Sequence, residues 1–169
     1  MILQLPQSLI DEMVAHARDD LPNECCGVIA RDADGSLSLY RATNSEASPW
    51  RFNIPPQQLL HLYNAIDAAD GDLLVIYHSH VASEARPSPT DLNIARLHKG
   101  VQEWPYWVLV SLAYDPPHVR AWRIDEGEQP DTVTPVEIDL TVSNDDGARR
   151  LRLELIEVDG RPRVRETAL

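Results

Sequence analysis

Residues 77 to 91 read YHSHVASEARPSPTD, which spaces two histidines, a serine and an aspartate as His78-x-His80-x7-Ser88-x2-Asp91. The apolar run DLLVIY leads into this stretch and predicts a strand that is buried on both faces of a sheet. Alternate residues of a strand point to the same face, so both histidines can turn their imidazoles toward one point, about 6 to 7 Å apart along the chain. The sequence therefore predicts a metal site at the end of a central strand.

The segment that follows predicts both a helix start and a third ligand. Ser88 to Asp91, SPTD, has the pattern of a capping box with proline at the first helical position, and the apolar spacing of PTDLNIARLH continues it. Two imidazoles and one carboxylate, with no evident fourth protein ligand, are typical of catalytic zinc, in which water takes the open position. We expect one Zn2+ ion on His78, His80 and Asp91, with water as its fourth ligand.

The expected hydrolytic chemistry also requires a carboxylate that moves protons. Glu24, in PNECCGV, is the best candidate because it precedes a short apolar strand that runs into the core. The structural alternatives stay open at this point. Glu24 could be an ordinary solvated loop carboxylate, the histidines could be strand residues satisfied by hydrogen bonds, and Ser88 with Asp91 could do no more than start a helix.

The composition limits the class of protein. With 169 residues and 43% hydrophobic content, the chain is long enough for one globular domain, alone or with a short extension. A formal net charge of −12 argues against a nucleic-acid partner, because phosphate binding needs a cationic surface. The sequence has no run of 18 apolar residues and no signal peptide, so we expect a cytoplasmic protein without membrane contact. The adjacent Cys25 and Cys26 are expected to be packed thiols.

The remaining periodicity predicts an α/β fold in which helices flank a mixed sheet. The expected helices are residues 6–20, 57–70 and a third that begins at residue 88, and the expected strands are residues 24–30, 36–43, 72–80, 106–113 and 118–125. From residue 126 onward, two or three strands joined by Asp-Gly turns are expected. We therefore divide the chain into a domain of residues 1–125 and a β-rich C-terminal extension of residues 126–169.

Taken together, Glu24 in PNECCGV, the pair His78 and His80, and RPSPTD resemble the JAMM (MPN+, Mov34/JAB) zinc metalloprotease signature, and every position of that signature is filled. The resemblance covers residues 1 to about 125. It implies a cytidine-deaminase-like α/β fold, zinc held by His78, His80 and Asp91, Glu24 as general acid and base, and Ser88 as the residue that steadies the oxyanion.

Within this family, HARDDLPNECCGVIA and LLVIYHSHVASEARPSPTDL are most similar to the small bacterial Mec-type hydrolases of sulfur-carrier proteins. This similarity implies cleavage at the C-terminal Gly-Gly of a ubiquitin-like sulfur carrier, with release of cysteine, as a step of cysteine biosynthesis. Two alternatives remain, a deubiquitinase-like isopeptidase that frees protein lysines and a non-catalytic MPN scaffold. We expect the carrier tail to add as a strand beside the His78 strand. The extension could cover a sheet edge, form a homodimer contact or recognise the carrier.

Overall fold

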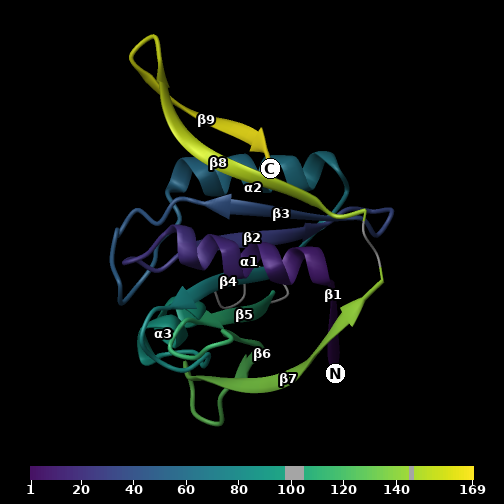
Figure 1. Ribbon diagram of the computed structural model, residues 1–169, viewed down its shortest axis with the longest axis vertical. Helices are drawn as coiled ribbons and strands as arrows, with labels where there is room; N and C mark the ends of the chain where they lie inside the picture. The colour runs from purple at the N-terminus through teal and green to yellow at the C-terminus, as the bar shows by residue number, and fades with distance from the viewer. Residues whose placement is uncertain (98–104, 145–146) are drawn as a thin grey trace.

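A single mixed sheet of nine strands runs through the computed structural model, which describes residues 1–97, 105–144 and 147–169 (Figure 1). The strands are β1 (Ile2–Pro6), β2 (Cys26–Arg31), β3 (Leu37–Ala42), β4 (Asp72–His80), β5 (Tyr106–Ser111), β6 (His118–Glu126), β7 (Val133–Ser143), β8 (Arg149–Val158) and β9 (Arg161–Ala168). Their order across the sheet is β1-β7-β6-β5-β4-β2-β3-β8-β9. β4 lies at the centre, parallel to β5 and antiparallel to β2. The sheet is mixed and flanked by helices, which confirms the predicted fold class.

Three helices cover the two faces of this sheet. On one face, α1 (Gln7–Asp19) contributes Leu9, Met13 and Ala17 to a core with β2, β3 and β4. Figure 1 shows α1 crossing in front of these central strands. On the other face, α2 (Pro56–Ala68) and α3 (Pro89–Leu97) pack on a separate apolar cluster. No helix within the described ranges is long and apolar enough to cross a membrane.

The N-terminus differs from the sequence prediction. The first helix begins at Gln7, and residues 2–6, which the prediction left unassigned apart from Pro6, form β1, a strand parallel to β7. Pro6 has an extended backbone (ψ 144°) and therefore ends the strand instead of opening the helix. The buried Leu3 and Leu5 flank the exposed Gln4, an alternation that is typical of a strand. The pairing partner lies more than a hundred residues away in sequence, so no local pattern could indicate it.

The three strands after residue 126 belong to the same sheet as the rest of the chain. β7 pairs with β6 and with β1 at one edge, whereas β8 pairs with β3 at the other edge and carries β9 outward. The number of strands agrees with the prediction of two or three, and Asp159 and Gly160 form the expected Asp-Gly turn, with φ of 52° and 73°. The division into residues 1–125 and 126–169 stays a prediction.

Candidate active site

The C-terminal end of β4 and the first turn of α3 bring three potential ligands together. His78 Nε2 lies 3.2 Å from His80 Nε2 and 3.2 Å from Asp91 Oδ2, and His80 Nε2 lies 3.3 Å from Asp91 Oδ2. All three side chains are buried. The three residues that the spacing predicted as metal ligands therefore form a triangle of facing donor atoms, which we call the ligand triangle.

The dimensions and chemistry of the ligand triangle fit a tetrahedral metal ion. With metal–ligand bonds of about 2.0–2.1 Å, neighbouring ligands of a tetrahedral zinc site lie about 3.3 Å apart. His80 Nδ1 must donate its hydrogen to the carbonyl oxygen of Glu84, 2.7 Å away, because a carbonyl only accepts. The neutral imidazole then keeps a free lone pair on Nε2, the atom that faces the other two ligands.

Charges within the triangle favour an ionised carboxylate. Burial raises the pKa of Asp91, but the positive charge of His78, the hydrogen bonds that both histidines donate when they are protonated and the backbone amide of Ser88 together hold it well below its ordinary value of 3.8. Burial lowers the pKa of His80, whereas the two hydrogen bonds that its protonated ring donates, to Asp91 and to the Glu84 carbonyl, raise it, with a net increase above 6.5. A proton on His80 would compete with a metal ion, so metal binding is expected to weaken on acidification.

The predicted capping box is present and also orients the carboxylate ligand. Asp91 N donates to Ser88 Oγ at 3.2 Å, and Ser88 N donates to Asp91 Oδ2 at 2.7 Å. The two hydrogen bonds therefore start α3 and aim the Asp91 carboxylate at the histidines at the same time. Capping and metal binding are compatible functions of one motif.

Glu24 is not a solvated loop carboxylate, because its side chain is only 4% exposed. Its Oε2 atom is buried and has no hydrogen-bond partner within the described residues. Burial raises the pKa of Glu24 to about 8, an increase that the charge of His80 opposes and that of Asp91 reinforces. Charges in the ligand triangle therefore influence the pKa of Glu24, and a carboxyl group with this pKa can exchange a proton near neutral pH.

A serine between the two histidines fixes the backbone next to Glu24. Ser79 Oγ accepts a hydrogen bond from Cys25 N at 2.8 Å, and Ser79 N donates to Cys25 O at 3.1 Å. On the other side of the segment, Asn44 Nδ2 donates to Glu24 O at 3.0 Å. Ser79 lies between the two histidines, so the alternation of the strand turns it to the opposite face of β4, and no sequence motif indicates a function for it.

Ser79→Ala is expected to lower kcat by about 10-fold or more, since a small displacement of a catalytic group is costly. Zinc content should stay at the wild-type level because both histidines remain. Ser79→Thr, which keeps the hydroxyl, is the matched variant, and it should restore part of the rate. Equal kcat for wild type and Ser79→Ala would show that Ser79 does not position Glu24.

Aromatic rings support His78 from the core side. Phe52 stacks on the imidazole with ring centroids 4.5 Å apart, and Trp107 meets it edge-on at 5.7 Å. Trp122 Nε1 donates to the carbonyl oxygen of Ala85 in the loop between the histidines and α3. These contacts join segments that are distant in sequence, so the sequence pattern alone did not identify them.

Three further histidines and both cysteines lie outside the ligand triangle. His16 bonds to Tyr77 Oη, His61 to Glu166, and His118 stacks on Tyr114. His98 lies outside the described residues.

Cys25 and Cys26 are buried free thiols, as expected, and burial raises the pKa of Cys25 to about 12. A thiol with such a pKa is a poor nucleophile at neutral pH.

The mixed sheet and the buried triangle of two histidines and one aspartate, which could hold a metal ion, are the features expected of a JAMM-type domain. Residues 6–125 match the family described as prokaryotic homologs of the JAB domain, and the chain belongs to this family. Among similar proteins, the CysO-cysteine peptidase of Mycobacterium tuberculosis is 37% identical over 129 residues, which cover 75% of this chain and 85% of that protein.

Two further comparisons agree with this assignment. The desampylase of Haloferax volcanii is 31% identical over 120 residues, which cover 67% of this chain and 81% of that protein. The solution structure of protein DSY2949 from Desulfitobacterium hafniense aligns with a TM-score of 0.63 at 30% identity, covering 85% of this chain and 94% of that one.

Proposed function

We propose that this protein is a zinc-dependent JAMM hydrolase that cleaves the bond after the C-terminal Gly-Gly of a ubiquitin-like sulfur carrier and releases cysteine. The observation that carries the proposal is the ligand triangle together with the buried Glu24, whose Oε2 atom has no hydrogen-bond partner among the described residues and whose pKa is influenced by His80 and Asp91. Membership of the JAB family and the name of the mycobacterial relative, a CysO-cysteine peptidase, support the reaction and the leaving group.

The site residues have distinct roles in this reaction. His78, His80 and Asp91 would hold zinc, which polarises a scissile carbonyl and makes water more acidic when bound. Glu24 takes a proton from the attacking water and then delivers it to the leaving amine, a task that suits its raised pKa. The Ser88 hydroxyl, at the start of α3, donates a hydrogen bond to the oxyanion of the tetrahedral intermediate.

A second candidate differs in the leaving group. The Haloferax relative is a desampylase, which supports an isopeptidase that frees a lysine side chain instead of cysteine. Both reactions need the same proton transfers by Glu24, so only a comparison of substrates can distinguish them. A scaffold without activity is disfavoured because three residues that could hold a metal ion lie together and because their charges influence the buried Glu24.

The deciding experiment compares two substrates with the zinc-loaded full chain. One is a sulfur carrier that ends in Gly-Gly-Cys, and the other is the same carrier joined to a lysine of a protein. Mass spectrometry should show loss of cysteine from the first substrate at a much higher rate than cleavage of the second. Faster cleavage of the lysine conjugate would favour the isopeptidase, and zinc binding without cleavage of either would favour the scaffold.

Ser88→Ala is expected to lower kcat by about 100-fold or more, the usual effect of losing one oxyanion donor. Zinc content should be unchanged, because Asp91 keeps its hydrogen bond from the Ser88 backbone amide. The loss of the cap should also destabilise the protein by about 1 kcal/mol. Ser88→Thr keeps both the hydroxyl and the cap and serves as control. A fully active Ser88→Ala protein would remove the serine from the mechanism.

A homodimer also stays a prediction. Because β7 and β8 are hydrogen-bonded to β6 and β3, removal of residues 126–169 would expose two sheet edges. Light scattering on the full chain is therefore the appropriate measurement of oligomeric state, and a truncated chain is a poor substitute.

A further inference from the structure

The edge of β8 is open beyond the end of its neighbour β3. The two strands are parallel and their last partner pair is Arg41 with Arg152, but β8 continues to Val158. Along this continuation β9 pairs with one side of β8, and in the part of the chain that the structure describes no strand pairs with the other. We call this stretch of β8, residues 153–158, the open edge.

The pairing pattern shows which backbone groups face the open edge. Leu169 N donates to Arg150 O, so even-numbered residues of β8 bond to β9 and odd-numbered ones face the opposite side. The chain leaves β3 after Ala42, and Thr43 N donates to the side-chain oxygen of Gln58 at 2.8 Å. The amides of Leu155 and Glu157 therefore face the open edge without a β3 partner.

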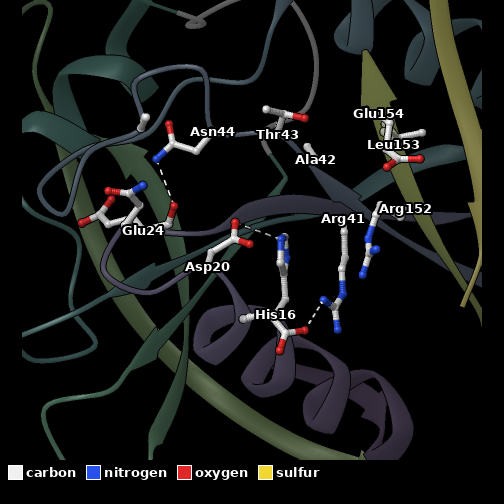
Figure 2. Close-up of a pocket in the computed structure, with 13 residues that line it drawn as sticks. His16, Asp20, Glu24, Arg41, Ala42, Thr43, Asn44, Arg152, Leu153 and Glu154 are labelled. Carbon is white, nitrogen blue, oxygen red and sulfur yellow. Dashed lines mark hydrogen bonds and ion pairs between the residues drawn. The ribbon is translucent and has the colours of Figure 1, made fainter. Parts of the chain in front are cut away.

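A pocket lies between the first residues of the open edge, Leu153 and Glu154, and the segment that carries Glu24, and none of the residues of the ligand triangle lines it. Its volume is about 540 Å³, and its walls include Arg152, Leu153 and Glu154 of β8 on one side and Glu24 and Asn44 on the other. Figure 2 shows these two groups of residues facing each other across the end of α1, which contributes His16. β8 lies beyond residue 125, where the match to the JAB family ends, so this pocket is partly built by the C-terminal extension.

Arg152 is the cation of this pocket that remains available for a ligand. The Arg41 guanidinium donates hydrogen bonds to the carboxylates of Glu12 and Asp19, and Glu154 accepts a hydrogen bond from Arg165 Nε. Arg152 is exposed and has no carboxylate within ion-pair distance among the described residues, although its charge helps to lower the pKa of Asp19. A substrate that lies along β8 would meet the exposed Arg152 guanidinium beside backbone groups that have no strand partner in the described part of the chain.

We propose that the tail of the ubiquitin-like carrier adds as a strand to the open edge of β8. This inference rests on the proposed function. The sequence-based prediction that the tail adds beside β4, the strand of His78, is wrong. Both sides of β4 are already paired, with β2 and with β5. An extended tail that ends in glycines meets the requirements of strand addition, which uses backbone groups and needs little side-chain space.

The geometry also sets the direction of the tail. Leu153 lines the same pocket as Glu24, whereas Val158 lies at the far end of β8, next to the turn into β9. Each residue of a strand advances about 3.3 Å, so the tail must run from Val158 back toward Leu153 to bring its C-terminal end to Glu24. It is therefore antiparallel to β8, with the folded body of the carrier near the tip of the β8–β9 hairpin.

Amide exchange measured by NMR on the zinc-loaded full chain tests this geometry. The probe is a synthetic peptide with the sequence of a carrier tail ending in Gly-Gly, a reaction product that is not cleaved further. At saturation, exchange at Leu155 and Glu157 should slow by about tenfold or more, while Glu154 and Ile156, which already bond to β9, should change little. Binding without protection of Leu155, or no binding at all, would overturn the proposal.

Leu155→Pro provides an independent arm, because it removes an amide that faces the open edge and leaves the bonds to β9 in place. KM for the carrier-cysteine substrate should rise by about five- to tenfold with kcat within about twofold of wild type, and Leu155→Ala, which keeps the amide, should match wild type. Equal KM for the two variants refutes strand addition while the proposed function stands. Absence of hydrolysis by wild type refutes the function itself. If Leu155→Pro does not fold, the exchange measurement decides.

Discussion

Glu24→Gln is expected to lower kcat by about 1,000-fold or more, within the upper range for loss of a general acid or base. The substitution preserves the size of the side chain but removes its ability to accept and release a proton. Glu24 is suited to this role because it is buried, its Oε2 atom has no hydrogen-bond partner in the described part of the chain, and burial raises its pKa to about 8. The measurement is kcat on the carrier-cysteine substrate, with zinc content by elemental analysis on the same sample.

Zinc content separates a chemical role of Glu24 from a structural one. Glu24 is not part of the ligand triangle, so the Glu24→Gln variant should bind zinc as wild type does. A variant that retains zinc and hydrolyses at the wild-type rate would exclude Glu24 as the proton carrier. Loss of zinc together with activity would instead indicate that Glu24 shapes the metal site.

The same variant should change how stability depends on pH in the metal-free protein. The pKa of Glu24 is raised from an ordinary 4.5 to about 8 in the folded state. The folded chain therefore holds this proton more tightly than the unfolded chain does, and its stability falls as the pH rises from about 4.5 to 8. A glutamine side chain carries no such proton, so Glu24→Gln should flatten this dependence in thermal unfolding followed between these pH values.

The ligand triangle could be predicted from sequence because its geometry is local. His78 and His80 share a face through the two-residue period of a strand, and Asp91 is placed by a capping motif that starts its own helix. Both devices act over a few residues. Glu24 is different, because it is separated from His78 by more than fifty residues and its place beside the triangle depends on the pairing of β2 with β4. The residues indicated Glu24 only as a candidate, and the family resemblance gave it a role.

Features that depend on which strands become neighbours could not be predicted in this way. β1 pairs with β7 across almost the whole chain, and β8 lies beside β3 although the sequence suggested only an appended group of strands. The open edge of β8 is a consequence of two unequal strand lengths, β3 ending at Ala42 while β8 continues. The lengths of β3 and β8 indicate an open edge only once it is known that the two strands pair with each other.

His80→Ala is expected to abolish zinc binding at micromolar metal and to reduce hydrolysis to background. A carboxylate and one imidazole would remain, fewer than the three protein ligands of a catalytic zinc site. His80 also ties the site to the loop before α3 through its hydrogen bond to the Glu84 carbonyl, so the variant loses orientation of the loop as well as a ligand. Zinc affinity measured by chelator competition and kcat on the carrier-cysteine substrate should fall together.

His61→Ala is the matched control for this variant. His61 is a histidine of helix α2 that bonds to Glu166 and lies outside the ligand triangle. It should keep wild-type zinc affinity and kcat. Zinc should raise the melting temperature of wild type and of His61→Ala, because a ligand that binds only the folded state stabilises it, and should leave that of His80→Ala unchanged. An active, zinc-loaded His80→Ala protein would mean that the triangle is a hydrogen-bonded cluster and that the metal binds elsewhere.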